Sequence, residues 1–450
     1  MAETAPLVWM DAFGLSLTGG TGIATYSREL AATLRGSGLG LGLLYGRPVR
    51  PGLDPMAREI AFFDAGNRLR RPLAKRLVGM LRRQLAEPVP PGVVDRGLSS
   101  AALQEGFSTA NVPECDGVWN ADDIFGRAVV HMHVLRRMLH LRLAEGAPPR
   151  LMHWTHMHGL RLEGALNIYT VHDAIPLRMP WAALDHKGRW MATMRAVAAS
   201  ADHIVTVSEH ARQDLISLFG IPPERITNTY QSVPPMRTAL DPRASRERLA
   251  SVYGLEDRGY HLCLSAVDPR KNVARIMDAY IASGVTRPLI LVGPKHGNAA
   301  AELRLLTAAD GTESRDGRII HLGYLPRADV EVLLRHARSL CFPTLYEGFG
   351  LPAVEAMQAG TAVLTSTAAC MPEVVGDAAL CVPPTDTRAI ADALRALDAD
   401  DALRERLQAA GPARAALFSP ERHHERLGAL YARLGLPFRA SGAGEQAQAA

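Results

Sequence analysis

The stretch Phe342-Pro-Thr-Leu-Tyr-Glu347-Gly-Phe-Gly350-Leu-Pro-Ala-Val-Glu355-Ala-Met357 decides the fold class of this 450-residue chain. Residues 339–343 predict a buried strand, the glycines predict a sharp turn, and Pro352 is well placed at a helix start. Glu347 therefore falls in a strand-to-helix turn, and Glu355 falls inside the helix. Repeated strand, turn and helix units are typical of α/β proteins with a parallel sheet.

The turn itself has the composition of a ligand-binding loop. Gly348 and Gly350 let the backbone turn sharply and approach a ligand closely. The amides from Phe349 to Leu351 would then face a pocket at a helix N-terminus, where backbone N–H groups attract anions. A carboxylate near these amides can bind sugar hydroxyls, and a second one can hold a ribose diol. The alternative is a capped structural turn with two solvated glutamates.

The same alternation continues on both sides of this stretch. After a proline-bearing link at 231–243, strands are predicted at 261–266, 288–293, 318–323, 339–343 and 361–365, and the last helices at 386–397, 401–417 and 420–434. Before the link, strands are predicted at 6–10, 168–171 and 204–207. The first strand is followed by a glycine loop containing Gly20 and Gly22 and by a helix at 23–34, the opening of a nucleotide-type α/β unit.

These elements predict two Rossmann-like parallel-sheet domains, at 1–232 and 244–419, that face a central cleft. The helix at 420–436 is expected to pack back on the first domain, and residues 437–450 are expected to be disordered. The segment 46–165 carries no motif that can be placed.

Composition bounds the function. Hydrophobic residues make up 47% and charged residues 21%, and the net charge of +4 is too small to favour nucleic acid as a partner. The five cysteines include no C-x-x-C pair, which indicates a reducing compartment rather than a disulfide framework or a zinc site. No signal peptide or transmembrane run is evident, so a soluble, cytoplasmic protein is expected.

The positive charge gathers between Arg58 and Arg83, which hold eight basic and two acidic side chains. The basic residues, including Arg70, Arg71, Lys75 and Arg76, interleave with leucines that share one helical face. Such a helix either lies on an anionic membrane surface or packs its apolar stripe on its own domain while the arginines face water.

The stretch at 342–357 resembles the E-x7-E signature of the retaining GT-B glycosyltransferases of family 4. Other segments look like landmarks of that family in the same order: His172-Asp173-Ala-Ile-Pro176, Val207-Ser208-Glu209, Asp268-Pro-Arg270-Lys271-Asn272 and Pro372-Glu373-Val-Val-Gly-Asp377. The resemblance covers roughly residues 5–45 and 165–435. The first and third of these segments look most like the mannosyltransferase branch that builds O-antigen and related surface polysaccharides.

The resemblance implies roles for residues of the second domain. Glu347 would contact the donor sugar, and Glu355 would hold the nucleotide ribose. Arg270 and Lys271 would neutralise the diphosphate, an expectation supported by the negative charge that a nucleoside diphosphate gains on leaving. Many family members carry an arginine just after the preceding strand, whereas this chain has Ser265-Ala-Val. The diphosphate grip would then depend on Arg270, or on Lys271 and backbone amides.

In the first domain, His172 matches the family's histidine beside the donor sugar, the alternative being a core histidine at a strand end. Asp173 would either orient a hydroxyl or stabilise the turn, and His156 and His158 would line the acceptor side of the cleft. Gly20 and Gly22 would let the first loop approach the diphosphate, or they form a plain tight turn.

No metal or other cofactor is expected. Asp398-Ala-Asp400 has the form of a metal-binding D-x-D, but it is predicted to be a polar link between two helices. The pairs His131/His133 and His156/His158 lack the spacing of a known metal site.

The expected function is metal-independent, retaining transfer of a hexose, mannose from GDP-mannose being favoured, to a lipid-linked saccharide acceptor. A lipid-linked acceptor would bring the enzyme to the inner face of the plasma membrane. A UDP-sugar-dependent glucosyl or GlcNAc-type transferase of the same fold is the first alternative, and a non-catalytic polysaccharide-assembly component is the second. A nicotinamide-dependent oxidoreductase has only the glycine loop in its favour, since no G-x-G-x-x-G with a later acidic partner is present.

Overall fold

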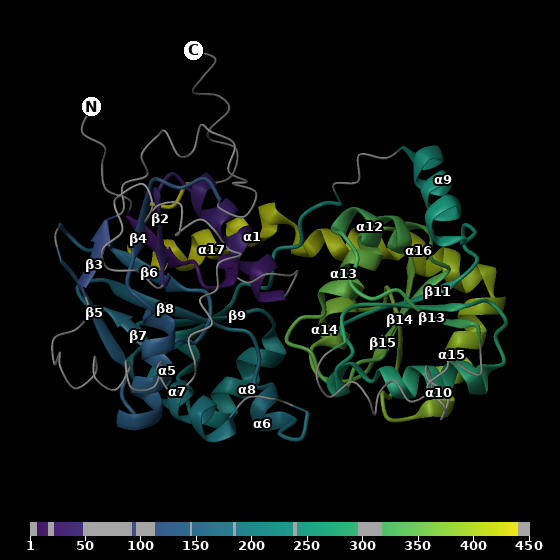
Figure 1. Cartoon of the computed structure of the whole chain (residues 1–450), viewed down its shortest axis with the longest axis horizontal. Coiled ribbons are helices and arrows are strands. Elements are labelled where there is room, and N and C mark those ends of the chain that lie inside the picture. The colour runs from purple at the N-terminus through teal and green to yellow at the C-terminus, as the bar shows by residue number, and fades with distance from the viewer. Residues whose placement is uncertain are drawn as a thin grey trace, which may run out of the picture.

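The computed structural model describes residues 7–16, 22–47, 92–95 (backbone only), 113–144, 146–182, 186–236, 241–295 and 317–439. These residues form two α/β lobes that lie side by side, each built around its own sheet (Figure 1).

The first lobe contains a ten-stranded sheet within the described residues, in the order β10-β9-β8-β6-β1-β2-β4-β3-β5-β7. All neighbouring strands are parallel except β3 and β4. The strands are β1 (Val8–Asp11), β2 (Leu41–Tyr45), β3 (Gly92–Asp95), β4 (Gly117–Asn120), β5 (Leu139–Leu143), β6 (Leu151–Trp154), β7 (Leu160–Leu162), β8 (Leu166–Val171), β9 (His203–Thr206) and β10 (Ile226–Asn228).

Helices cover both faces of this sheet, α1 and α17 on one side and α5, α7 and α8 on the other (Figure 1). This double cover explains why the central strands are almost continuously apolar and buried. The helical elements are η1 (Gly14–Ser16), α1 (Gly22–Gly36), α5 (Ile124–Leu135), α6 (Ile175–Arg178), α7 (Lys187–Ser200), α8 (Glu209–Phe219), η3 (Pro223–Arg225) and the returning α17 (Pro420–Arg433).

The second lobe contains a six-stranded parallel sheet in the order β13-β12-β11-β14-β15-β16. This is the order of a doubly wound Rossmann sheet, in which the chain winds outward in both directions from the two central strands. The strands are β11 (His261–Leu264), β12 (Leu289–Val292), β13 (Ile319–His321), β14 (Ser339–Phe342), β15 (Ala362–Ser366) and β16 (Leu380–Val382).

Here α10 and α15 cover one face and α12, α13 and α16 cover the other (Figure 1). The apolar side chains of α10, α15 and the strands form one core, which contains Met277, Tyr280, Leu291 and Leu394. The helical elements are α9 (Pro242–Tyr253), η4 (Pro269–Lys271), α10 (Val273–Ser283), α12 (Arg327–His336), α13 (Leu351–Gln358), α14 (Met371–Val375), α15 (Thr387–Ala399), α16 (Asp401–Ala415) and η5 (Ala416–Phe418).

The chain returns to the first lobe at its C-terminal end. Helix α17 packs on α1, and the Tyr431 hydroxyl lies 2.8 Å from Nδ1 of His153 on β6. Where the chain leaves the first lobe, the Val233 amide donates to the carbonyl of Phe418, at 2.8 Å, where the chain comes back. The outgoing and returning segments therefore run side by side between the lobes.

The predicted α/β fold with two parallel sheets is confirmed, and the elements near the E-x7-E stretch begin within a few residues of their predicted positions. Strands β2, β10 and β16 were not predicted, and neither were the elements β3, β4, α5, β5, β6 and β7 of the unplaced segment 46–165. The missed strands have three to five residues, which is too short for a periodic signal to stand out from turns, whereas α5 has 12 residues. The tail 440–450 lies outside the described residues.

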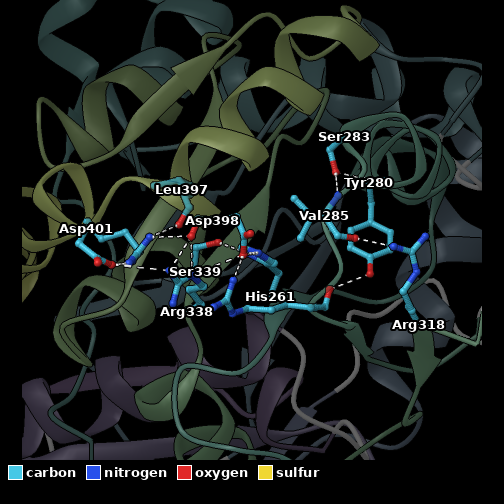
Figure 2. A network of polar contacts seen from close by, with 12 residues as sticks. His261, Tyr280, Ser283, Val285, Arg318, Arg338, Ser339, Leu397, Asp398 and Asp401 are labelled. Atoms are coloured by element: carbon cyan, nitrogen blue, oxygen red, sulfur yellow. Dashed lines mark hydrogen bonds and ion pairs between the residues drawn. The ribbon is translucent and has the colours of Figure 1, made fainter.

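The interpretation of Asp398-Ala-Asp400 as a link needs a correction, because Asp398 lies in the last turn of α15. Its carboxylate accepts from Nη1 of Arg287 at 2.8 Å and lies 3.2 Å from Nε2 of His261. Figure 2 shows this polar network with Arg338 beside it, at the end of the sheet where β11 and β14 begin. Asp400 caps α16. Both carboxylates thus have structural partners.

Candidate active site

The two central strands of the second sheet bring distant residues together. Strands β11 and β14 are parallel neighbours, so the turns that follow them meet at the carboxyl edge of the sheet, at the point where strand order reverses. Lys271 comes from the first turn and Glu347 from the second. Nζ of Lys271 lies 2.5 Å from Oε1 of Glu347, with side-chain exposures of 13% and 9%. The hydroxyl of Thr344 donates to the same carboxylate oxygen at 3.0 Å.

Local contacts hold the two turns against each other. The amide of Leu345 donates to the carbonyl of Arg270 at 2.8 Å. The side-chain amide of Asn272 donates to the carbonyls of Pro343 and Pro384, at 2.9 and 2.7 Å. Asn272 itself has φ of 62°, a left-handed conformation that asparagine tolerates better than most residues. The position of Lys271 is therefore set by the same loop that carries Glu347.

Arg270 contacts an acidic residue of its own turn. Its Nε lies 3.5 Å from Oδ1 of Asp268, the residue that caps the short helix η4. Of the basic pair predicted to hold the diphosphate, Lys271 is the member that reaches Glu347.

Glycine is needed at positions 348 and 350 for different structural reasons. A Cβ built on Gly348 would lie 2.5 Å from the carbonyl oxygen of His172 in the first domain, so this position brings the two domains within backbone contact. Gly350 has φ of 89°, a conformation that side chains disfavour, and its Cβ would also meet the sulfur of Met371 at 2.6 Å. Both positions require glycine, as the turn predicted.

Helix α13 begins directly after this turn, with Gly350 as its N-cap and Pro352 in its first turn. Phe349 is buried, and its ring lies 5.1 Å from that of Phe418 at the domain crossing. Leu351 faces the start of α1, where a Cβ on Gly22 would lie 3.8 Å from it. Gly22 therefore lies at the predicted site, whereas Gly20 lies outside the described residues.

Glu355 is buried inside α13 and pairs with Nη1 of Arg327 on α12. Arg327 also lies 3.0 Å from Glu331, so one guanidinium serves two buried carboxylates. Burial raises the pKa of Glu355, while Arg327 acts in the opposite direction. Sequence reasoning missed Arg327, because an arginine in the first turn of a helix carries no signal of its own.

The first domain contributes a wall of histidines at the carboxyl ends of β6 and β8. Nε2 of His172 lies 2.9 Å from the carbonyl of Thr155 and must donate to it, which leaves Nδ1 as an acceptor. The ring of His156 lies over that of His172, with centroids 6.1 Å apart, and its buried Nδ1 has no hydrogen-bond partner among the described residues. Burial lowers the pKa of both histidines, to about 3 for His156, so both rings are neutral.

Asp173 follows His172 and accepts from the amide of Ile175 at 3.0 Å, which supports the predicted turn-stabilising role. Behind the histidines lies Asp11, fully buried at the end of β1, with His158 3.5 Å away. His158 was predicted beside His156 on the acceptor side, whereas Asp11 was not predicted, although its position at the carboxyl end of the first strand was a usable signal.

The predicted membrane residues Arg70, Arg71, Lys75 and Arg76 lie outside the described residues. Where the structure describes the chain, no helix is long and apolar enough to cross a membrane. In the same residues, no three His, Cys, Asp or Glu side chains gather closely enough to hold a metal ion.

Two α/β domains, each built on its own sheet and meeting where Gly348 approaches the backbone of His172, have the arrangement of the GT-B glycosyltransferase fold. Residues 245–414 match the family model "Glycosyl transferases group 1", and residues 120–235 match "Glycosyltransferase Family 4". The chain belongs to glycosyltransferase family 4 and is a glycosyltransferase, which confirms the resemblance seen in the sequence.

Among curated proteins, the chain is 36% identical over 269 residues to O-antigen chain mannosyltransferase B of Escherichia coli, covering 58% of this chain and 68% of the relative. It is 31% identical over 254 residues to the serotype-specific mannosyltransferase WbdA of the same species, covering 55% of this chain and 31% of that longer protein. Among solved structures, sucrose-phosphate synthase from Thermosynechococcus elongatus matches with a TM-score of 0.63 at 16% identity, covering 95% of this chain and 98% of that one. This last likeness concerns the fold alone.

Proposed function

We propose that this enzyme transfers mannose from GDP-mannose, with retention of configuration, to a lipid-linked saccharide during synthesis of a surface glycan. The observation that carries the proposal is the Lys271–Glu347 pair at the reversal point of the second sheet, directly before Gly348, which approaches the backbone of His172 in the first domain. The mannosyltransferase names of the curated relatives support the choice of sugar.

The pair lies where sugar and diphosphate would meet. A diphosphate that accepts hydrogen bonds from Lys271 and from backbone amides at the start of α13 would develop negative charge as the glycosidic bond breaks, and both contacts would favour that charge. Glu347, released from part of its contact with Lys271, would accept hydrogen bonds from sugar hydroxyls. Nδ1 of His172 supplies an acceptor for a hydroxyl from the opposite wall.

Glu355 would accept the ribose hydroxyls, a role supported by its position on the helix that begins beside the proposed diphosphate site. The acceptor would enter from the first domain, past His156. Fixed protein cations would take the place of a metal ion, so we expect full activity in the presence of EDTA.

Donor screening tests the proposal. GDP-mannose, UDP-glucose and UDP-GlcNAc are offered to the purified enzyme with short lipid-linked mannosides, and the anomeric configuration of the product is read by NMR. We expect transfer from GDP-mannose with retention. A strong preference for a UDP-sugar would identify the other transferase class, and an inverted product would refute the retaining assignment.

Glu347→Ala separates an enzyme from an assembly component without turnover. In cells that lack the native gene, the variant should fail to restore the glycan while the protein accumulates normally. Glu405→Ala, on the exposed face of α16, is the matched control and should restore it. Full restoration by Glu347→Ala would favour a non-catalytic role.

We propose in addition that the basic segment 58–83 brings the enzyme to the cytoplasmic face of the membrane. Binding to liposomes should require anionic lipid, weaken with salt, and be lost when Arg70, Arg71, Lys75 and Arg76 become Glu. If binding did not depend on salt, or if no binding occurred, the segment would not be an electrostatic membrane anchor.

A further inference from the structure

Tyr346, the residue directly before Glu347, belongs to the second domain by sequence, but its side chain packs against the first domain. Its side chain packs in an apolar cluster with Ile175, Met179 and Ala182, and the residue is only 7% exposed. Because Tyr346, Glu347 and Gly348 are consecutive, one short loop holds the contact with the first domain, the site carboxylate and the close approach to His172.

The hydroxyl of Tyr346 donates to a carboxylate across the domain boundary. The acceptor is Oδ2 of Asp214 on α8, a residue only 5% exposed. The other oxygen of Asp214 accepts from Nε of Arg178 at 2.9 Å. His210, one turn earlier on α8, lies 3.6 Å from Asp214, and its ring centroid lies 5.5 Å from that of Tyr346.

Helix α8 receives a second contact from the second domain at its N-terminus. Glu373 on α14 accepts from the amides of Glu209 and His210, at 2.6 and 2.9 Å. This carboxylate satisfies two of the amides that a helix start leaves open and complements the helix dipole. A loop and a helix of the second domain, which carry Tyr346 and Glu373, therefore both contact α8 of the first domain.

We propose that Tyr346 and Asp214 are positioning residues for the transfer reaction: their hydrogen bond places the Glu347 loop in its working geometry when the two domains close. The inference rests on the proposed function for Glu347. The Glu373 contact fixes α8, so that Asp214 presents a defined acceptor. Donor binding itself uses Lys271, Glu355 and the α13 amides, none of which contacts Asp214.

The chain offers a matched control. Tyr253 on α9 hydrogen-bonds to Asp329 on α12, and Arg248 pairs with the same aspartate. This arrangement has the same three residue types as Tyr346, Asp214 and Arg178, but all three of its residues belong to the second domain. Tyr253→Phe therefore removes the same chemical group without touching the domain contact.

The experiment compares Tyr346→Phe, Asp214→Asn, the double variant and Tyr253→Phe. Loss of a hydrogen bond to a charged group should lower kcat by roughly 10- to 100-fold. The KM for GDP-mannose, the Kd of GDP and the melting temperature should stay close to those of the wild type. The double variant should be no slower than the worse single variant, since both remove one contact. Tyr253→Phe should keep the wild-type kcat.

Small-angle X-ray scattering with saturating GDP gives a readout that does not need turnover. We expect a larger radius of gyration for Tyr346→Phe than for the wild type and Tyr253→Phe. If the wild type transfers no sugar, the proposed function fails while the scattering still tests the contact. If the wild type is active, a kcat and a radius of gyration that are both unchanged in Tyr346→Phe would overturn the inference. A loss of kcat in the double variant equal to the product of the two single losses would overturn it as well.

Discussion

Nζ of Lys271 lies 2.5 Å from the carboxylate of Glu347, although 76 positions separate the two residues in the chain. The pairing follows from topology, because both residues end turns that leave adjacent parallel strands. The lysine compensates a carboxylate that is almost fully buried. A diphosphate that binds Lys271 would therefore leave the carboxylate of Glu347 available to the sugar. Binding of the diphosphate and binding of the sugar would in this way be coupled.

Replacing Lys271 tests this relationship. Lys271→Met should lower kcat/KM by about 100- to 1,000-fold, since it removes a cation from the leaving group and strands a buried carboxylate. Lys271→Arg keeps the charge but not the compact ammonium and should recover only part of the loss. Lys295→Met, at an exposed position of the same domain, is the control. If Lys271→Met and Lys295→Met had equal kcat/KM values, Lys271 would have no role in the reaction.

Gly348→Ala should separate the domains locally without unfolding either one. Its Cβ would lie 2.5 Å from a backbone oxygen of the first domain, and a backbone atom cannot swing aside as a side chain can. We expect a fall in kcat of at least about 10-fold with a nearly unchanged melting temperature. Gly317→Ala, where nothing lies within 4 Å, should behave as the wild type. Wild-type turnover by Gly348→Ala would mean that the reaction does not need this approach.

The Arg327–Glu355 pair predicts a pH dependence of nucleotide binding. Burial raises the pKa of Glu355, and Arg327 holds it down. The ionised carboxylate is the better acceptor for ribose hydroxyls, so GDP affinity should fall as the pH falls through that pKa. Arg327→Gln removes the cation, raises the pKa further and moves the loss of affinity to higher pH.

Calorimetric titration of GDP between pH 5 and 8 measures this shift. Arg335→Gln, at an exposed position of the same helix, is the control for the loss of one positive charge. The double variant Arg327→Gln/Glu331→Gln removes the neighbouring carboxylate too and should move the profile back toward the wild type. Superimposable profiles for Arg327→Gln and the wild type would show that Arg327 does not control Glu355.

The Asp398 network in Figure 2 predicts an acid-sensitive contribution to stability. The hydrogen bond from His261, together with Arg287, lowers the pKa of Asp398 to about 2. Its stabilisation is therefore complete above the ordinary aspartate pKa of about 3.9 and is lost as the pH falls toward the folded value. Asp398→Asn should cost about 1–3 kcal/mol at pH 7, and the difference from the wild type should shrink below pH 4.

Urea unfolding of both proteins at a series of pH values measures this difference. Asp392→Asn is the control, since Asp392 lies on the same helix in an exposed pair with Arg395. A destabilisation of Asp398→Asn that does not depend on pH would show that its charge is unimportant.

The sequence by itself determined the alternation of strands and helices, the position of Glu347 in a turn and of Glu355 in a helix, and the need for glycine at 348 and 350. These features depend on neighbours within a few residues, through periodicity, backbone conformation and helix-start chemistry. The family resemblance added a prediction of which turns bind the donor.

Only the tertiary structure decided which of these turns meet. Lys271 of the basic pair contacts Glu347. Gly348 approaches the backbone of His172, and the hydroxyl of Tyr346 donates to Asp214. The landmarks at 207–209 and 372–373 could be read separately in the sequence, but their contact through Glu373 could not. Such pairings join residues more than 70 positions apart, and they are set by strand order and by the packing of one domain on the other, which no local pattern encodes.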